Sequence, residues 1–456
     1  RHTLEGDTFM IKVIRSYKRN HTYWKEAKPL EFNGEITPNQ KLIVVKSDVT
    51  YQTHQGFGGA FTEAAAITLN EMNEDEKKRV MNAYFSEDGL RYNLGRTVIH
   101  SSDFSESSRT YIEEGDASLE SFNMDEDDKL ITPFIKDALS LNPDLWLLSS
   151  PWSPPAFMKT NNDLYYGGRL KKEHYTTWAK YFVNYIKGMN DRGIRIGATT
   201  LQNEPEATQA WESCSFTAQE ELALAREVHR ELENAGLDTK IIIWDHNRDV
   251  AAERAHAILK EIPDYIWGVG YHWYVTEDSK NLSVIHDLYP DKHILFTEGC
   301  VELTNTAQDS TGEEGELWTH GQFYGRNIIK DSLNYSEGFI DWNLILNEIG
   351  GPNHVENYCE APIMYDRTTK EVMYNPSYYV IGHFSRYVEP GAKRIHINHT
   401  VDENVFATAY KNPSGDLVII IQNEDWIRQF TMIVDGQSVD ISLPEKSITT
   451  YIVKAK

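Results

Sequence analysis

The sequence predicts a (β/α)8 barrel, an α/β fold, joined to a smaller antiparallel β-sandwich domain. Eight short strand-like runs alternate with helical patterns between residues 56 and 344, which is the order expected of a barrel of parallel strands. From residue 393 onward apolar and polar residues alternate between turn residues, which predicts an antiparallel sandwich. The length of 456 residues also favours one large domain and one smaller one.

Most of the eight runs begin with apolar residues and end in polar or aromatic ones. This gradient is typical of a strand that is buried on both faces and opens into a site at its end. Residues 173–192 and 218–235, which lie between runs, have helical apolar spacing or good helix formers. A doubly wound open sheet is the alternative fold, but no Gly-rich phosphate fingerprint follows the first strand. The runs are residues 56–62, 96–103, 144–152, 196–204, 240–246, 267–274, 293–298 and 338–344.

Both ends of the chain are expected to contribute to the sandwich, because residues 11–14 and 41–45 are also strand-like. We predict N-terminal strands within residues 1–50, a barrel at 51–388 and a C-terminal sandwich at 389–456. Residues 1–9 precede Met10, and we interpret them as a remnant ahead of the natural start. That start would place the protein in the cytoplasm. The alternative is a secreted protein whose signal peptide has been removed.

Composition and charge exclude several classes of binding partner. The net charge of −24 argues against binding to nucleic acid or to an anionic membrane surface, and no apolar stretch is long enough to span a membrane. Three Cys residues without a C-x-x-C pair form neither a disulfide framework nor a zinc site. We expect no metal and no cofactor. The aromatic content of 12% suits a carbohydrate-binding cleft, where flat rings with polar tips are favoured. The sequence does not determine the oligomeric state.

Two glutamates follow apolar strand-like runs and are the candidate catalytic residues. Glu204 lies in the string LQNEP and Glu298 in LFTEG. In a closed barrel both would lie at the C-terminal mouth, where two facing carboxyl groups can cleave a glycosidic bond. The context of Glu204 suits a general acid/base and that of Glu298 a nucleophile, which Tyr274 would keep ionised by donating a hydrogen bond. For a single Glu, an ordinary loop carboxylate is the simpler interpretation.

Several strings together give the chain a specific resemblance to a known family. It resembles glycoside hydrolase family 30, the retaining β-glycosidases that include lysosomal glucosylceramidase and microbial β-1,6-glucanases. The resemblance implies a (β/α)8 barrel with an attached β-sandwich, Glu204 as acid/base, Glu298 as nucleophile and no metal. The matching strings are GFGGAFTEA from residue 56, DFS at 103–105, SSPWSPPAFMKTN at 149–161, QNEP at 202–205, HWY at 272–274, TEGC at 297–300, DWNLILNEIGGPNHVENYCEAPI at 341–363 and HFSRY at 383–387.

The resemblance also implies a pocket for the terminal sugar. One departure is His354, which stands where glucosylceramidase-like members often carry Trp beside the leaving group. It weakens the case for a ceramide-sized leaving group. Residues 165–169 and Trp211 are this chain's own and are expected at the entrance. His272 is a candidate for substrate binding, and a hydrogen-bonded barrel histidine is its simpler interpretation. The candidate substrate-binding residues are Asp103, Trp152, Asn203, His272, Tyr274, Trp342 and Asn357.

These observations predict a retaining, exo-acting β-glycosidase that hydrolyses β-linked glucosides or related β-glycosides. Endo-β-1,6-glucanase, glucosylceramidase and β-xylosidase activities are alternatives within the family. A non-catalytic sugar-binding relative is the alternative outside it, but both glutamates are present. A metal-dependent barrel hydrolase would need clustered His and Asp residues at the strand ends, and that pattern is absent from the sequence.

Overall fold

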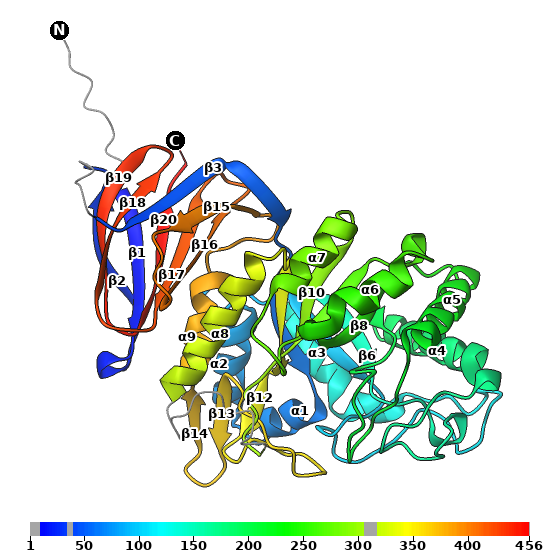
Figure 1. The fold of residues 1–456 in the computed structure, drawn as a ribbon. Helices are drawn as coiled ribbons and strands as arrows, with labels where there is room; N and C mark the ends of the chain where they lie inside the picture. The colour runs from blue at the N-terminus through cyan, green and yellow to red at the C-terminus, as the bar shows by residue number, and fades with distance from the viewer. Residues whose placement is uncertain (1–9, 34–39, 305–316, 456) are drawn as a thin grey trace. The chain divides into compact units, whose positions relative to one another are not determined.

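The computed structural model describes residues 10–33, 40–304 and 317–455 (Figure 1). The chain divides into two compact units, one of residues 1–56, 313–337 and 375–456 and the other of residues 57–312 and 338–374. The predicted boundaries near residues 50 and 388 stay a prediction. The interpretation of residues 1–9 as a remnant lies outside the described residues, and the cytoplasmic location that depends on it also stays a prediction.

Eight parallel strands close into a barrel, as predicted, in the order β10-β11-β4-β5-β6-β7-β8-β9. The inside is filled by one apolar residue from each of six strands: Leu94, Leu148, Ala198, Ile242, Leu295 and Ile340. The barrel is therefore a packed core, which leaves its C-terminal mouth for chemistry. The strands are β4 (Gly56–Phe61), β5 (Leu94–Ile99), β6 (Trp146–Pro151), β7 (Ile196–Thr200), β8 (Lys240–Asn247), β9 (Gly268–His272), β10 (His293–Glu298) and β11 (Gly338–Asn343).

Several predicted strands extended too far at their C-terminal ends. Asp103, Trp152, Glu204 and Tyr274 all lie in loops beyond the last strand residue. The physical reason is that these polar or aromatic ends leave the ladder and turn into the mouth. At the first strand, Gly58 allows close packing, because a Cβ there would come within 1.8 Å of the carbonyl oxygen of Leu94.

Helices follow the strands on the outside of the barrel (Figure 1). The predicted helix at 173–192 is α4, and its apolar face buries Trp178, Tyr181 and Phe182. The predicted helix at 218–235 is α5, which begins with a capping box between Thr217 and Glu220. The helices of this unit are α1 (Glu63–Asn70), α2 (Glu74–Phe85), α3 (Ile131–Leu141), α4 (Tyr175–Asp191), α5 (Ala218–Asn234), α6 (Ala251–Leu259) and α7 (Lys280–Leu288).

A small three-stranded sheet, which the sequence did not predict, belongs to the same unit. It has the order β12-β13-β14, with β12 (Ile345–Asn347), β13 (Ile363–Asp366) and β14 (Glu371–Tyr374). Strand β12 follows barrel strand β11 after one residue. The segment between β12 and β13 therefore starts and ends in ordered structure, and it carries Asn353, His354 and Asn357.

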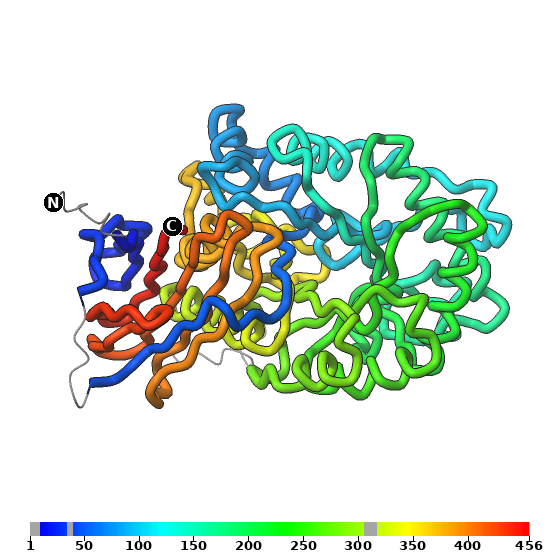
Figure 2. The backbone as a smooth tube through the Cα atoms, turned by 90° about the horizontal axis from the view of Figure 1, so that it is seen from above, coloured from blue at the N-terminus to red at the C-terminus, as the bar shows by residue number. Residues whose placement is uncertain are grey.

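The second unit is the predicted sandwich, a nine-stranded sheet in the order β19-β18-β3-β15-β16-β17-β20-β1-β2. The strands that come first and last in the chain, β1 and β20, lie side by side, because β1 pairs with β20 along its length (Figure 2). One pair, β3 with β18, is parallel rather than antiparallel. Helices α8 (Leu317–Ser332) and α9 (Pro376–Ser385) belong to this unit. The strands are β1 (Met10–Tyr17), β2 (Thr22–Glu31), β3 (Leu42–Thr53), β15 (Lys393–His399), β16 (Val405–Lys411), β17 (Leu417–Asn423), β18 (Arg428–Val434), β19 (Gln437–Leu443) and β20 (Ser447–Val453).

Alternate side chains of these strands form the sandwich core, which includes Ile11, Ile43, Ile419, Met432 and Tyr451. Among the described residues, no helix is both long and apolar enough to cross a membrane.

Candidate active site

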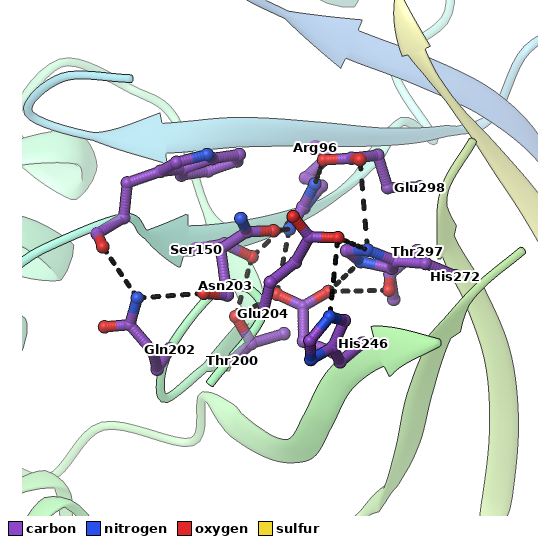
Figure 3. A network of polar contacts seen from close by, with 12 residues as sticks. Arg96, Ser150, Thr200, Gln202, Asn203, Glu204, His246, His272, Thr297 and Glu298 are labelled. Atoms are coloured by element: carbon purple, nitrogen blue, oxygen red, sulfur yellow. Dashed lines mark hydrogen bonds and ion pairs between the residues drawn. The ribbon is translucent and has the colours of Figure 1, made fainter. Parts of the chain in front are cut away.

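The two predicted glutamates meet at the C-terminal mouth of the barrel (Figure 3). Glu298 is the last residue of β10, and Glu204 follows β7 by four residues. A carboxylate oxygen of each, and a ring nitrogen of His272, all lie within 4.8 Å of one another. Two carboxyl groups at this spacing can address one anomeric carbon, whereas groups further apart would leave room for a water between them.

The backbone at Glu204 is held in an unusual conformation. Its φ of 49° is in the left-handed region, which a non-glycine residue adopts only when its surroundings enforce it. The amide of Glu204 donates to the carbonyl oxygen of Asp245 at 3.0 Å. Trp244 and Asp245 also have positive φ values, 74° and 58°, where the pairing of β8 with β9 shifts register. The irregular backbone after β7 and at the end of β8 therefore directs the Glu204 side chain across the mouth of the barrel.

Two donors hold the carboxylate of Glu298. Arg96 Nη1 donates to Oε1 at 2.8 Å and the Tyr274 hydroxyl donates to Oε2 at 2.7 Å. Burial and the nearby charge of Glu298 keep the pKa of Tyr274 well above its ordinary value, so the hydroxyl remains a donor. Burial raises the pKa of Glu298 itself, and the charge of Glu204 adds to this, against the attraction of His272 and Arg96. The predicted contact of Tyr274 with Glu298 is therefore present.

Glu204 has a different set of neighbours. His272 Nδ1 donates to its Oε2 at 3.1 Å, and His246 Nε2 lies 3.9 Å from the same oxygen. Burial raises the pKa of Glu204, but the hydrogen bond from His272 and the charges of both histidines outweigh burial and leave the pKa below its ordinary value. The two carboxyl groups therefore differ in their partners, with histidines beside Glu204 and an arginine and a tyrosine beside Glu298.

Asp245, which the sequence did not single out, lies beneath both glutamates and is fully buried. Arg96 Nη2 and the Thr200 hydroxyl each donate to its Oδ2 at 2.8 Å. On Oδ1 it accepts from His272 Nε2 and from the Thr297 hydroxyl, each at 2.7 Å. Burial raises the pKa of Asp245, but the charges of Arg96 and His272 outweigh it and hold the pKa well below its usual range. Asp245 thus supplies a fixed negative charge that orients a cation toward each glutamate.

His272 is protonated in this arrangement. Burial lowers its pKa, but the charges of Glu298 and Asp245 outweigh burial and raise the pKa to about 9. The two ring nitrogens face two carboxylates, Nδ1 toward Glu204 and Nε2 toward Asp245. His272 therefore forms a bridge between Glu204 and Asp245.

Asp103 is held by the segment between β12 and β13. Its Oδ2 accepts from Asn353 Nδ2 at 3.0 Å and from Asn357 Nδ2 at 3.1 Å. Burial raises the pKa of Asp103 to about 7, with the two amide hydrogen bonds opposing this shift. Both side-chain amides donate to Oδ2, so Oδ1 is the atom that can accept a hydrogen bond from a sugar hydroxyl. Asn353, which the sequence did not predict, also accepts from the amides of Val355 and Asn357 and so shapes the loop.

Trp152 and Trp342 stack beside the catalytic pair. Their rings lie 5.3 Å apart with an interplanar angle of 16°, and the residues are 2% and 4% exposed. The Arg96 guanidinium lies 4.8 Å from the Trp152 ring centroid. Arg96 Nη2 donates to Asn203 Oδ1 at 2.9 Å, so Asn203 Nδ2 is the group that can donate to a sugar. The structure therefore brings all the predicted site residues to one mouth.

Arg96 and Asp245 were not predicted from the sequence. Both lay inside predicted strand runs, and the available signal was a charged residue within an otherwise apolar run, which must be paired when it is buried. Arg96 donates to Glu298, Asp245, Asn203 and Ser150, and its side chain is fully buried.

Family models match nearly the whole chain. The TIM-barrel domain of glycosyl hydrolase family 30 matches residues 54–388, and the family's beta sandwich domain matches residues 391–451. The lysosomal acid glucosylceramidase of Mus musculus is 30% identical over 399 residues, which cover 84% of this chain and 77% of that protein. The endo-1,6-beta-D-glucanase neg1 of Aspergillus fumigatus is 28% identical over 432 residues, which cover 88% of this chain and 85% of that protein.

Solved structures agree with this result. SrfJ from Salmonella typhimurium superposes with a TM-score of 0.92 at 34% identity, with coverage of 98% of this chain and 100% of that one. The endo-beta1,6-glucanase BT3312 superposes with a TM-score of 0.86 at 25% identity, again with coverage of 98% and 100%. The fold, the two matched domains and these relatives lead to one conclusion: the chain is a glycoside hydrolase and belongs to glycosyl hydrolase family 30.

Proposed function

We propose that the chain is a retaining, exo-acting β-glucosidase that cleaves a terminal β-linked glucose by double displacement. The observation that carries the proposal is the approach of Glu204 and Glu298, whose oxygens lie within 4.8 Å. Retaining enzymes place their two carboxyl groups about 5–5.5 Å apart, and inverting enzymes leave about 6.5–9.5 Å. Both curated relatives named above act on glucosides, which supports glucose as the sugar.

In the first step Glu298 attacks the anomeric carbon and Glu204 protonates the departing oxygen. Arg96 and Tyr274 hold the two oxygens of Glu298, which orients one lone pair toward the sugar and stabilises the carboxylate that leaves in the second step. Glu204 must carry the proton first. In the free site the hydrogen bond from His272 stabilises the ionised form of Glu204, so substrate binding has to raise the pKa of Glu204 before this proton transfer. In the second step Glu204 takes a proton from water, and that water displaces Glu298.

The burial of the side chains that are expected to hold the terminal sugar supports exo-action. Asp103, Trp152 and Trp342 are each less than 5% exposed, and Asn353 and Asn357 close over Asp103. Buried contacts of this kind suit a single terminal sugar, whereas endo-action needs a groove that is open at both ends. Endo-β-1,6-glucanase activity is the second candidate, favoured by the two glucanase relatives.

The test uses aryl β-glucoside, gentiobiose and a linear β-1,6-glucan. We expect release of β-glucose as the first product, observed by proton NMR before mutarotation, and release of single glucose units from chain ends. Glu298→Gln should abolish turnover. Glu204→Ala should slow poor leaving groups far more than a dinitrophenyl glucoside. Initial release of α-glucose would contradict retention, and random shortening of the glucan would favour the endo-glucanase.

A further inference from the structure

Beside the catalytic pair, the barrel mouth holds two of the three cysteines of the chain, Cys300 and Cys359, which we name the thiol pair. Cys300 lies two residues after Glu298, and Cys359 lies in the segment between β12 and β13. Both are free thiols, and each is a hydrogen-bond partner of the other. The glycosidic reaction described above assigns no role to either sulfur.

The backbone brings the thiol pair together. Residues 302 and 359 form an isolated antiparallel bridge. The amide of Glu360 donates to the carbonyl oxygen of Val301 at 2.9 Å, which continues this pairing by one residue. Residues 300 and 359 are therefore diagonal neighbours on one face of the pairing, where side chains come within reach of each other. Both cysteines pack in the same buried cluster as Trp152 and Trp342.

Each member of the thiol pair contacts a group that holds a functional carboxylate. The Tyr274 hydroxyl, which donates to the nucleophile, lies 3.5 Å from Cys300 Sγ. Cys359 Sγ faces the carbonyl oxygen of Asn357 at 3.9 Å. Asn357 Nδ2 in turn donates to Asp103 at 3.1 Å. The thiol pair thus links the partner of the nucleophile to the partner of the carboxylate that is expected to hold the sugar.

A small oxidant can reach the thiol pair through the mouth of the barrel. Cys300 is 5% exposed and Cys359 is 2% exposed. The second step of the proposed reaction needs a water beside Glu298, and the half-buried Tyr274 hydroxyl lies between Glu298 and Cys300, at 2.7 Å from the first and 3.5 Å from the second. Hydrogen peroxide is little larger than water and can follow the same route.

Both thiols keep their protons at neutral pH. The contact with Cys359, together with burial, raises the pKa of Cys300 well above its ordinary value. The contact with Cys300 lowers the pKa of Cys359, but burial and the nearby charge of Asp103 outweigh it and leave the pKa raised. The thiolate is the form that attacks an oxidant. The thiol pair therefore resists brief exposure and responds to sustained exposure.

The oxidation needs one molecule of hydrogen peroxide and balances without another reactant. The sulfur of Cys300 attacks one peroxide oxygen, the O–O bond breaks, and the departing hydroxide takes the thiol proton and leaves as water. The sulfur of Cys359 then attacks the resulting sulfenic acid. The S–S bond forms, the S–O bond breaks, and a second water leaves with the Cys359 proton. Two thiols are oxidised and one peroxide is reduced to two waters.

A disulfide would distort the site. Its sulfurs must come to about 2 Å from each other, much closer than two thiols in non-bonded contact. The carbonyl oxygen of Cys300 accepts from Trp273 Nε1 at 3.2 Å, so the approach draws on the segment that carries Cys359 and Asn357. A displacement of about 1 Å in a catalytic site can cost about a hundredfold in rate. Oxidation should therefore lower activity while the fold is kept.

We propose that Cys300 and Cys359 are a redox-sensitive pair, which hydrogen peroxide converts to a disulfide that reversibly lowers the activity of the enzyme. The inference rests on the proposed β-glucosidase activity for its functional consequence and adds a means of regulation to the same site. The disulfide itself can be detected without any substrate.

The experiment treats the reduced protein with millimolar hydrogen peroxide for several hours and then removes the peroxide with catalase. Mass spectrometry after alkylation and digestion should find a peptide pair joined through Cys300 and Cys359. The kcat/KM on an aryl β-glucoside should fall about tenfold or more. Dithiothreitol should release the peptides and restore the activity, whereas methionine sulfoxide would not be reduced by a thiol reagent at this rate.

Cys359→Ser keeps the size of the side chain and cannot form the disulfide. Compared with its own untreated state, this variant should keep its activity after peroxide. The matched control is Cys214→Ser, which removes the third buried thiol, one that faces the carbonyl oxygen of Gly168 at 3.6 Å. Cys214→Ser should still lose activity to peroxide and regain it with dithiothreitol.

The outcomes separate this inference from the β-glucosidase proposal. Absence of aryl β-glucoside hydrolysis by the untreated protein would overturn the β-glucosidase proposal, and the mass measurement would still decide whether the disulfide forms. Absence of the joined peptides would overturn this inference alone. So would an equal loss of activity in Cys359→Ser, or a disulfide that leaves kcat/KM unchanged.

Discussion

Replacing Asp245 with Asn removes one of the two charges that keep His272 protonated and the carboxylate that orients Arg96. Burial lowers the pKa of His272, but the charges of Glu298 and Asp245 raise it to about 9, against an ordinary value of 6.5. That gap corresponds to about 3 kcal/mol of stability. Because the folded pKa is the higher one, this stabilisation is complete below about pH 6.5 and is lost as the pH rises through about 9.

The variant keeps the shape of the side chain but not its acceptors. Asp245 accepts from Arg96 and Thr200 on one oxygen and from His272 and Thr297 on the other. Asn has one carbonyl oxygen and one NH2 group in place of the two carboxylate oxygens. Two of the four donors would therefore face an NH2 group instead of an acceptor. The least costly arrangement releases the proton from His272 Nε2. We therefore expect Asp245→Asn to lower the free energy of unfolding by about 3 kcal/mol at pH 6, in the range for a broken buried ion pair.

The assay is urea unfolding followed by tryptophan fluorescence at several pH values between 6 and 9.5. The difference between wild type and variant should be largest at pH 6 and should shrink toward pH 9.5. Asp238→Asn is the matched control, since Asp238 also lies 2.8 Å from an arginine, Arg195, but both side chains are more than 70% exposed. Asp238→Asn should change the free energy of unfolding little at any of these pH values. A difference between wild type and Asp245→Asn that stays constant across this pH range would refute the reasoning.

Three further predictions concern other contacts. Tyr274→Phe removes one donor to Glu298 and should lower kcat on aryl glucosides about tenfold; an unchanged kcat would contradict a role in holding the nucleophile. Arg96→Lys replaces a fork that reaches both Glu298 and Asp245 with a single ammonium, and steady-state kinetics should show a loss of kcat/KM of about a hundredfold or more. Thr217→Ala opens the capping box of α5 and should cost about 1 kcal/mol in urea unfolding with activity retained; reduced activity per folded molecule would link that helix to the site.

The sequence predicted the barrel strands because their apolar runs are short, regular and bounded by turns. It placed Glu204 and Glu298 at one mouth because the C-terminal ends of parallel strands converge. It did not single out Asp245 or Arg96, since a buried charge is recognised by its partners, and those lie on other strands. Their pairing depends on closure of the barrel rather than on local pattern.

The parallel pairing of β3 with β18 also could not be predicted from the sequence. Alternation predicts a strand and its buried face, but not its neighbour when the two strands lie far apart in the chain. An ion pair between Glu212 and His354 shows the same limit. Glu212 and His354 come from loops of different strands, and only the closed barrel brings them to 3.4 Å.

The order of the sandwich strands has a consequence for how the protein is made. Strand β20 lies between β17 and β1 in the sheet, and it pairs with both along seven residues. Until the ribosome has released residues 447–453, β1 and β2 have no sheet to join, and the edge of β17 is unpaired. An exposed edge of this kind is a template for association with other chains. Translation that stops before residue 447 should therefore yield a chain that aggregates, even with every catalytic residue already synthesised.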